Sequence, residues 1–283
     1  MITMTIDNFN LKQIAESGQC FRWKQIDKQG YRYSIIANGE YVEVEQAADK
    51  TFAFYCDDRT FREFWKEYFD ISADYTFAPA GEGCDPLIRK AAAAGSGIRI
   101  LKQEPWEILI TFLTAQNISI DRATVLIERL CETYGDLMFT DSGTAFHAFP
   151  KPETLAEIRP EDLRRLGFGY RDKQIINAAK IAACKAVDLY RLRETDHDTA
   201  KLVLTNIFGV GDKVAECICL FGLHHMEAYP VDTWVKKIEA YFGEGYIQQN
   251  YGSRAGLIQQ YLFAYVRQHG LPESRWNNKN ESY

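Results

Sequence analysis

The segment 204–238 combines a lysine, an aspartate and closely spaced glycines in an order that could support nucleophilic chemistry. Lys213 falls in the first turn of an apolar helix expected over 212–221, where the helix dipole disfavours a cation. With partial burial, that field would favour the neutral, nucleophilic amine. Asp232 is expected to be the N-cap of a second helix, over 233–242. Taken singly, Lys213 would be an exposed surface lysine and Asp232 only a cap. If the two helix starts converge, however, the pair could be a nucleophile and its electrostatic partner.

The turn that precedes Lys213 is suited to a phosphate group. Gly209 and Gly211 flank Val210 between two expected helices, and glycine lets the backbone turn tightly and approach a partner closely. The first N–H groups of the following helix are unpaired and point outward, so they can bind a phosphate oxygen. Such a turn would hold a nucleic-acid backbone without reading its sequence. A plain helix–helix turn is an equally good interpretation of these residues alone.

Two kinds of secondary structure are expected to position these residues. Residues 20–56 contain three runs of alternating apolar and polar side chains with a hairpin signal at Asn38-Gly39, which predicts an antiparallel sheet with one exposed face. From about residue 85 to 268 the apolar period is helical. The expected helices are 58–69, 86–94, 105–115, 120–134, 154–158, 160–166, 171–187, 198–206, 212–221, 233–242 and 255–268. The sequence therefore predicts an α+β fold, in which an N-terminal antiparallel sheet domain (1–85) packs on a mostly α-helical body (86–283).

Composition narrows the classes of function. The chain has 283 residues, of which 46% are hydrophobic and 25% charged, as in ordinary soluble globular proteins. Its net charge of -6 argues mildly against nucleic-acid binding driven by overall charge. No run approaches the roughly 20 apolar residues of a membrane span, and the start of the chain lacks a signal-peptide pattern. The 7 cysteines are scattered without a C-x-x-C pair, which disfavours zinc and iron–sulfur sites. We expect an intracellular monomer with reduced thiols and no membrane association.

The order of these motifs resembles a known family. A helix, Gly209-Val210-Gly211, a second helix with Lys213, and then Pro230-Val231-Asp232 are similar to the helix-hairpin-helix, glycine/proline-aspartate superfamily of DNA glycosylases. Within it, the chain resembles the 8-oxoguanine DNA glycosylase/AP lyases. Further matching motifs are spread over nearly the whole chain: 17–23 (SGQCFRW), 97–105 (GIRILKQEP), 166–171 (LGFGYR), 211–220 (GDKVAECICL), and Gln259 with Phe263.

The resemblance implies a reaction and a substrate. The family takes the damaged base out of the duplex before acting on it. Lys213 would attack C1′ of the nucleoside and displace 8-oxoguanine, and the resulting Schiff base would allow β-elimination of the 3′ phosphate. Asp232 would stabilise positive charge on the sugar and orient Lys213. This bifunctional glycosylase/lyase chemistry belongs to base excision repair, needs no cofactor, and acts on double-stranded DNA with oxidised guanine opposite cytosine.

Residues that would contact the DNA follow from the same resemblance. The main-chain carbonyl of Gly18 would accept the N7–H that 8-oxoguanine has and guanine lacks. Cys217 and Phe263 would sandwich the base, and Gln259, otherwise an exposed helix glutamine, would bind its Watson–Crick edge. The remaining assignments place Asn117 in the vacated space of the duplex, Tyr170 as a wedge, Arg122 and Arg171 on the opposite cytosine, Gly209, Val210 and Gly211 on a DNA phosphate, and a monovalent cation on the main-chain carbonyls of Thr205, Ile207 and Val210.

Two other readings stay open on sequence grounds. A sister glycosylase that removes alkylated bases shares the fold but lacks the lysine, so Lys213 argues against it. A non-catalytic module that binds DNA lesions is the alternative of a different class, since fold alone does not prove function. Retention of both Lys213 and Asp232 argues against that module.

Overall fold

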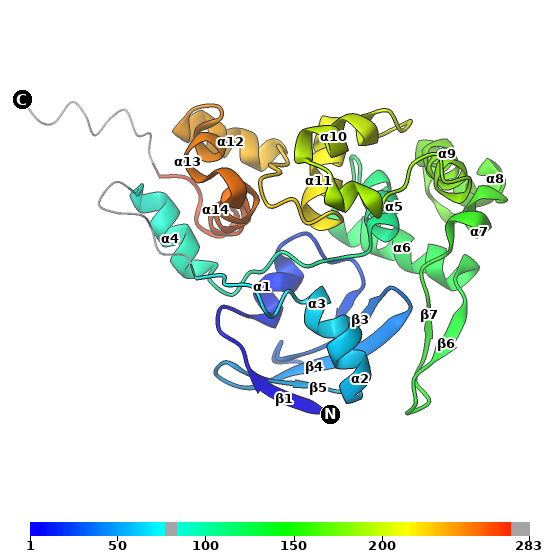
Figure 1. Cartoon of the computed structure of the whole chain (residues 1–283), viewed down its shortest axis with the longest axis horizontal. Helices are drawn as coiled ribbons and strands as arrows, with labels where there is room; N and C mark the ends of the chain where they lie inside the picture. The colour runs from blue at the N-terminus through cyan, green and yellow to red at the C-terminus, as the bar shows by residue number, and fades with distance from the viewer. Residues whose placement is uncertain (77–83, 273–283) are drawn as a thin grey trace, which may run out of the picture.

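A small sheet domain and a larger helical body make up the computed structural model, which describes residues 1–76 and 84–272 (Figure 1). A polar tail is expected at 273–283, which lies outside the described residues. The strands are β1 (Ile2–Thr5), β2 (Trp23–Gln25), β3 (Arg32–Ala37), β4 (Glu40–Ala48), β5 (Thr51–Phe54), β6 (Leu137–Phe139) and β7 (Ala145–His147). In the described part of the chain, no helix is long and apolar enough to cross a membrane.

The helices are α1 (Leu11–Glu16), α2 (Asp58–Thr60), α3 (Lys66–Tyr68), α4 (Pro86–Ala94), α5 (Pro105–Thr114), α6 (Ile120–Tyr134), α7 (Pro152–Ala156), α8 (Pro160–Leu166), α9 (Asp172–Ala183), α10 (His197–Thr205), α11 (Asp212–Phe221), α12 (Thr233–Phe242), α13 (Tyr246–Tyr251) and α14 (Ala255–His269). A π-helical stretch, Phe61–Trp65, joins α2 to α3, and three short 3₁₀ turns occur at Gly169–Arg171, Arg191–Glu194 and Gly252–Arg254.

The N-terminal sheet is antiparallel, with the strand order β1-β5-β4-β3-β2. Asn38 and Gly39 both have positive φ and connect β3 to β4, which confirms the hairpin predicted from their types. Along β3 every second side chain is buried, as the alternation in its sequence requires. Sequence reasoning missed β1, which pairs with β5 at the edge of the sheet.

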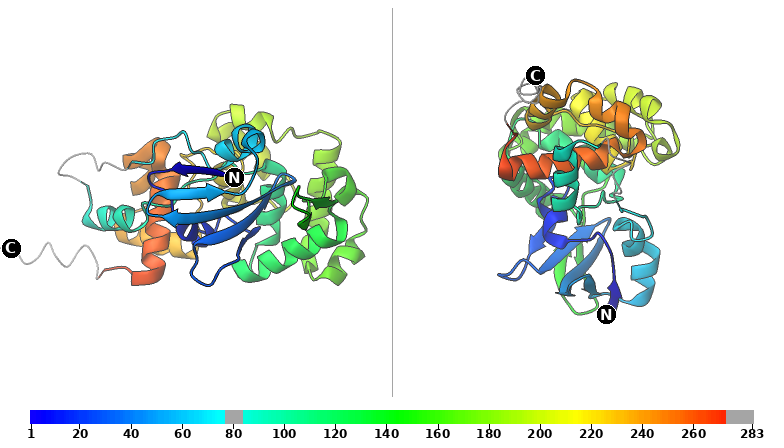
Figure 2. Two further views of the ribbon diagram at one scale, coloured as in Figure 1. Left: turned by 90° about the horizontal axis from the view of Figure 1, so that it is seen from below. Right: turned by 90° about the vertical axis from the view of Figure 1, so that its left-hand side faces the viewer.

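A mainly aromatic core holds the sheet to the helix that follows it. Phe54 lies on the sheet, and its ring centroid is 5.0 Å from that of Phe61 and 5.5 Å from that of Phe69. Trp65 is fully buried in the same cluster. Leu101, which comes after α4 in the chain, also belongs to this core, whereas Phe21 packs into the core of the helical body. The two cores therefore interlock through the segments that run between them (Figure 2).

The helical body contains the long amphipathic helices that the sequence predicts. The ranges of α4, α6, α8, α11 and α12 agree with prediction at both ends. Prolines take the first position of α4, α5, α7 and α8, where the missing N–H costs no hydrogen bond.

The body is not helical throughout, however, and the expectation of helical periods up to residue 268 is wrong at one place. A two-stranded hairpin, β6–β7, interrupts it. All three side chains of β6 are exposed, so no alternation between buried and exposed positions marks this strand in the sequence.

Candidate active site

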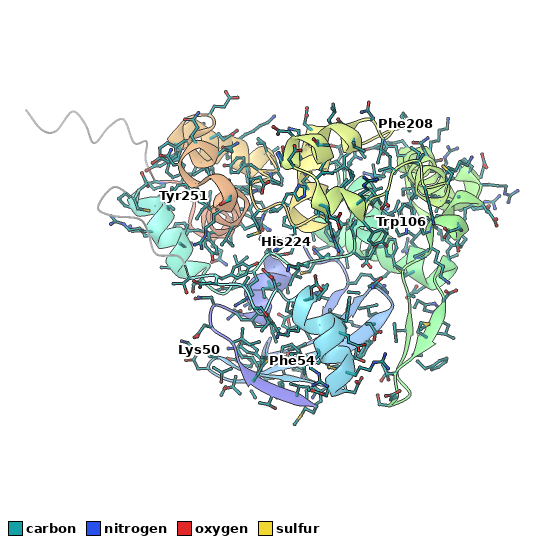
Figure 3. All side chains as sticks on the ribbon, in the orientation of Figure 1. Lys50, Phe54, Trp106, Phe208, His224 and Tyr251 are labelled. Carbon is teal, nitrogen blue, oxygen red and sulfur yellow. The ribbon has the colours of Figure 1, made fainter. Side chains whose placement is uncertain are left out.

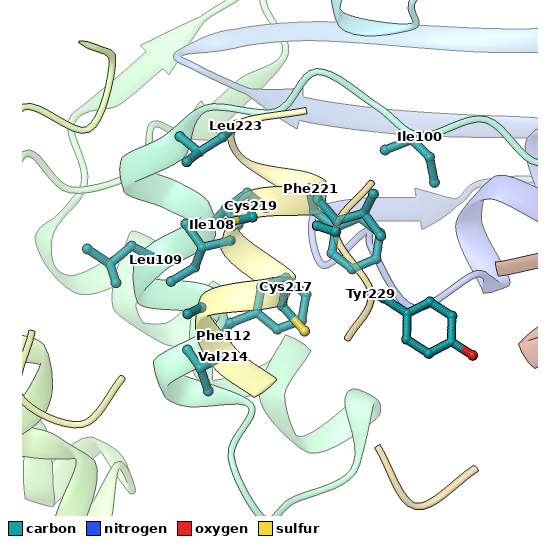
Figure 4. Close-up of a cluster of buried hydrophobic side chains, with 14 of the residues drawn as sticks. Ile100, Ile108, Leu109, Phe112, Val214, Cys217, Cys219, Phe221, Leu223 and Tyr229 are labelled. Carbon is teal, nitrogen blue, oxygen red and sulfur yellow. The ribbon is translucent and has the colours of Figure 1, made fainter. Parts of the chain in front are cut away.

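Helix α11 places Lys213 at the edge of a cavity. Its apolar side packs against α5, where the rings of Phe112 and Phe221 stack with centroids 5.5 Å apart (Figure 4). All residues from Val214 to Phe221 are buried, so the helix is firmly held while its first turn is open. The Lys213 side chain is exposed, and the partial burial expected for it is wrong: the apolar stripe that buries α11 begins one residue later.

Asp232 begins α12 as its N-cap, as expected from its position. Its Oδ1 accepts hydrogen bonds of 2.8 Å from the amides of both Trp234 and Val235. Because one carboxylate oxygen accepts both bonds, the cap leaves Oδ2 available for another partner. Lys213 and Asp232 line the same cavity, which has a volume of about 180 Å³.

The cavity also collects the residues that the resemblance assigns to the damaged base. Gly18, Cys217, Gln259 and Phe263 all line it, although they come from three separate parts of the chain, with Gln259 and Phe263 both on α14. Apolar residues without an assigned role complete its walls: Phe21, Phe112, Ala115, Ile118, Ile120, Phe221 and Pro230. Phe21 and Pro230 belong to motifs quoted above, whereas the only signal of the others in the sequence is the apolar character of the segments that carry them.

Cys217 gives the cavity a neutral wall. Its side chain is 3% exposed, and burial raises the pKa of its thiol to about 12, with a lowering effect from the charge of Lys213 and a raising effect from that of Asp232. The thiol is therefore protonated at neutral pH and acts as a small polarisable surface against the cavity.

The loop that contains Gly18 is fixed by hydrogen bonds to another segment. Gly18 has φ +85°, a conformation that favours glycine. The neighbouring Gln19 donates from Nε2 to the Arg99 carbonyl at 2.8 Å, and its Oε1 accepts from the Leu101 amide at 2.9 Å. The Ser17 hydroxyl donates to the Ile14 carbonyl at 2.7 Å. The main chain around Gly18 is thus held in place at the cavity wall.

Gln259 is buried rather than exposed. Only 3% of the residue is accessible, so the alternative of an exposed helix glutamine is wrong. Its Nε2 donates to the Pro230 carbonyl at 3.2 Å, and its Oε1 accepts from Nε2 of Gln260 at 2.7 Å. Both ends of the amide are therefore oriented by neighbours at the cavity.

The turn between α10 and α11 is compact and braced. Gly209 has φ +92°, and a Cβ at this position would lie 2.5 Å from the Gln174 side chain, so neither the conformation nor the space suits another residue. Gly211 is the N-cap residue of α11. Gln116, in the loop after α5, donates from Nε2 to the Gly209 carbonyl at 3.1 Å.

A second group of predicted residues lies next to this turn. Asn117 has φ +55° and donates from Nδ2 to the Tyr170 hydroxyl at 3.0 Å. The Arg171 guanidinium lies 4.7 Å from the centroid of the Tyr170 ring and donates to the Gln116 carbonyl. Arg171 is 6% exposed, so it is a buried rather than a surface arginine. Arg122, in the first turn of α6, is exposed.

The carbonyls that the resemblance assigns to a cation lie at the end of α10 and in the turn that follows it. Thr205 is the last residue of α10, and the Ile207 carbonyl accepts a hydrogen bond from the Val210 amide at 3.0 Å. Within the part of the chain that the structure describes, no group of three or more His, Cys, Asp or Glu side chains is placed to hold a metal ion.

A buried carboxylate on the far side of α11 was missed in the sequence. Glu216 accepts hydrogen bonds from the Lys201 ammonium at 2.9 Å and from the Tyr229 amide at 2.8 Å, and it lies 3.0 Å from Nε2 of His197. Although burial alone would raise the pKa of Glu216, these partners lower it below its usual value. The network ties α10 and the segment before Asp232 to α11. Its sequence signal is a lone acid within an apolar helix.

Comparisons with known proteins cover nearly the whole chain. Residues 1–109 match the model of the 8-oxoguanine DNA glycosylase N-terminal domain, and residues 110–244 match that of the HhH-GPD superfamily of base excision DNA repair proteins.

A probable N-glycosylase/DNA lyase of Methanothermobacter thermautotrophicus is 30% identical over 94% of this chain and 96% of its own length. An N-glycosylase/DNA lyase of Saccharomyces cerevisiae is 33% identical over 81% of this chain, which spans 66% of that relative. The structure is also similar to that of a Clostridium acetobutylicum 8-oxoguanine glycosylase/lyase in complex with double-stranded DNA containing cytosine opposite 8-oxoG. The TM-score is 0.85 at 33% identity, covering 94% of each chain.

Proposed function

Since the chain belongs to the 8-oxoguanine DNA glycosylase/AP lyases of the helix-hairpin-helix superfamily, we propose that it excises 8-oxoguanine opposite cytosine from duplex DNA and then cleaves the strand. The observation that carries this proposal is the convergence of Lys213 and Asp232 on the cavity that Gly18, Cys217, Gln259 and Phe263 also line. A nucleophile, a carboxylate and a base-sized recess are brought together there.

Lys213 acts first as the nucleophile. The neutral amine attacks C1′, a C1′–N bond forms, and the glycosidic bond breaks with its electron pair leaving on the base, which takes up a proton. The sugar ring opens to a Schiff base on Lys213, and loss of a C2′ proton expels the 3′ phosphate by β-elimination. The exposed position of Lys213 at the start of α11 supports this role because C1′ must reach the amine from outside.

Asp232 stabilises positive charge on the sugar as the glycosidic bond breaks. The geometry that supports this role is the use of Oδ1 alone in the helix cap, which leaves Oδ2 for the substrate or for the Lys213 ammonium. A carboxylate fixed by two amides needs little reorganisation when the charge appears.

One proton distinguishes the damaged base from guanine: the N7–H of 8-oxoguanine. The carbonyl of Gly18 accepts from N7–H of 8-oxoguanine, and the bracing of its loop by Gln19 supports a fixed position for that acceptor. Phe263 and the neutral thiol of Cys217 stack on the two faces of the base. Gln259 binds the Watson–Crick edge, exchanging at least one of its present hydrogen bonds for the base.

The duplex is held by the second group of residues, in which Arg122 is exposed and Arg171 is buried. Asn117 fills the space that the base vacates, Tyr170 is the wedge, and Arg122 and Arg171 bind the opposite cytosine. The pairing of Asn117 with Tyr170 and the contact of Arg171 with the Tyr170 ring support a common task. Gly209, Val210 and Gly211 bind a DNA phosphate. A monovalent cation on the carbonyls of Thr205, Ile207 and Val210 steadies that turn.

The chain works as two units in this proposal, a sheet domain (1–85) and a helical body (86–283). Two hydrophobic cores support the division, although Leu101 belongs to the sheet core, and Phe21, Tyr75 and Cys84 belong to the body core. We propose that the protein acts as a monomer. The substrate places the enzyme on DNA inside the cell.

Borohydride trapping on a duplex with 8-oxoguanine opposite cytosine tests the proposal. The wild-type protein and a Lys28→Gln control, altered at an exposed lysine of the sheet domain, should form a covalent adduct. Lys213→Gln should form none. Binding of the duplex without excision or an adduct would instead indicate a lesion-binding module, and excision of methylated purines without trapping would indicate an alkylbase glycosylase.

A further inference from the structure

A second, larger groove adjoins the cavity that contains Lys213. Its volume is about 710 Å³, and it shares Gly18, Asp232 and Phe263 with the smaller cavity but not Lys213. One wall is built from the start of α12 and the end of α14, which pack side by side (Figure 1). The other lining residues come from α1, the start of α6, and the end of α4 with the residues that follow it. The groove therefore extends from the mouth of the base cavity on the side of α12 and α14.

Trp234 lines this groove and holds a cation beside it. The Lys237 ammonium lies 4.4 Å from the centroid of the Trp234 ring, close enough for a cation–π contact. Both residues are on α12, and Lys237 is exposed. Among the described residues, no carboxylate forms an ion pair with Lys237, so its positive charge is oriented but not neutralised.

A second aromatic ring holds a second cation on the same wall. The Arg267 guanidinium lies 5.1 Å from the centroid of the Phe263 ring. Phe263 lines both the cavity and the groove, whereas Arg267 lines the groove alone. The Phe263 ring therefore lies between the base cavity and the groove, and the Arg267 guanidinium lies on its groove side. Arg267 is exposed, and the described part of the chain contains no ion pair to it.

Charge in the groove is unevenly distributed. Glu16, on α1, and Asp121, on α6, also line the groove, so an anion is repelled from that part of the lining. It is attracted to Arg267, which lines the groove, and to Lys237, which lies outside the lining and contacts the Trp234 ring. Asp232, at the junction with the base cavity, is neutralised in part by the two amides that it accepts. An anion is therefore best accommodated along the outer edge of α12 and α14.

We propose that Lys237, held by Trp234, and Arg267, held by Phe263, bind phosphates of the damaged DNA strand. This inference rests on the proposed function. A nucleotide with its base in the cavity has a phosphate on each side of its sugar, and the turn at Gly209–Gly211 can serve one of them. Arg267 in the groove lining, and Lys237 beside the groove on the Trp234 ring, are cations that can serve the other. Holding each cation on a ring reduces the entropy that a flexible side chain loses on binding.

The salt dependence of DNA binding measures these contacts directly. The probe is a duplex with a non-cleavable tetrahydrofuran abasic analogue opposite cytosine, titrated by fluorescence anisotropy between 50 and 200 mM KCl. Each phosphate contact contributes about 0.9 to the slope of log K against log salt. Lys237→Gln and Arg267→Gln should each lower the slope by about 0.9, and the double variant by about 1.8, with roughly eight-fold weaker binding per contact at 0.1 M KCl.

Matched variants separate charge from structure. Arg267→Lys keeps the charge and should retain the wild-type slope, and Lys28→Gln, on the sheet domain, should leave it unchanged. Unchanged slopes in Lys237→Gln and Arg267→Gln would overturn the proposal, even if their melting temperatures fell. Because the probe contains no oxidised base, this result is independent of excision: failure of the wild-type protein to excise 8-oxoguanine would refute the proposed function and not the phosphate contacts.

The role of the Trp234 ring is tested by a double-mutant cycle. Trp234→Phe retains a ring and should bind the same duplex nearly as the wild type does, whereas Trp234→Leu should approach the affinity of Lys237→Gln. Adding Lys237→Gln to Trp234→Leu should then weaken binding by much less than eight-fold. Full additivity of the two changes would show that the ring does not position the ammonium.

Discussion

Asp232 combines a structural task and a proposed catalytic task, and two substitutions can separate them. The cap uses only Oδ1, which accepts both amides at 2.8 Å. In Asp232→Asn the amide retains an oxygen for these two bonds, and Asn is as good an N-cap as Asp. The change therefore removes the negative charge and Oδ2 while the cap stays. Asp232→Ala removes the charge and the cap together.

The expected magnitudes differ between the two properties. Loss of the cap in Asp232→Ala costs about 1 kcal/mol, which lowers Tm by roughly 2 °C in a chain of this size; Asp232→Asn should leave Tm nearly unchanged. Loss of a fixed charge at the reacting sugar should slow base excision by about 10²- to 10³-fold in both variants. Binding to the abasic-analogue duplex should change by much less than the rate.

Single-turnover excision with enzyme in excess, differential scanning calorimetry and anisotropy provide the three measurements. The reasoning is refuted if Asp232→Asn excises 8-oxoguanine within about three-fold of the wild-type rate. A tenfold change in rate corresponds to about 1.4 kcal/mol of activation free energy, so a three-fold change would mean that the carboxylate contributes well under 1 kcal/mol. The reasoning is also refuted if affinity falls as much as rate, since the carboxylate would then act on ground-state binding.

Three further outcomes follow from the structure. Gly18→Ala, at φ +85°, should cost about 1 kcal/mol in backbone strain and reduce the preference for 8-oxoguanine over guanine in excision assays; retained preference would exclude a role for that carbonyl. Gly209→Ala would place Cβ 2.5 Å from Gln174 and should lower Tm and weaken duplex binding, with partial recovery in a Gly209→Ala, Gln174→Ala double variant. Burial alone would raise the pKa of Asp70, but the hydrogen bond and charge of His224 hold it at about 2. Because this folded pKa is depressed, the stabilisation is complete above about pH 4 and is lost as pH falls towards 2. Asp70→Asn should therefore flatten the acid limb of stability in urea titrations at several pH values, and an unchanged limb would contradict the assignment.

That Asp70 contact lies where the sheet domain meets the helical body. His224, in the segment after α11, is labelled between the two parts of the molecule in Figure 3. It approaches Asp70 Oδ2 at 3.3 Å, and Lys102 approaches Oδ1 at 3.2 Å. Acid-induced loss of this network should loosen the junction between the two cores. The Arg22–Glu128 ion pair and the hydrogen bonds from Arg99 to carbonyls of the sheet domain remain as further links.

Much of the fold was predictable because local signals agreed with the final packing. The prolines that begin α4 and α8, the glycine after each of these helices, and the apolar stripe of α11 gave correct boundaries. The β6–β7 hairpin and strand β1 were missed for two different reasons. The side chains of β6 are all exposed, and β1 is an edge strand whose partner, β5, is distant in sequence.

The sequence predicted which residues form the site and where they lie in their helices, but it did not predict how buried each side chain is. Spacing placed Lys213 and Asp232 at helix starts, because capping and periodicity are local properties. The burial of Arg171 and Gln259 and the exposure of Lys213 depend on which segments pack over them, and nothing local records that. That residues far apart in the sequence meet in one cavity was predicted only from the resemblance to known glycosylases.

Gln116 makes two contacts whose mechanical consequence reaches beyond its own position. Its side chain holds the Gly209 carbonyl, and its own carbonyl accepts from Arg171 beneath the ring of Tyr170. With the roles proposed above, Gln116 connects the turn that binds a phosphate to the residues that enter the duplex. The distance between the two is therefore fixed. With Asn117 in its proposed role, this distance sets how far Asn117 can enter the duplex once the turn has bound a phosphate.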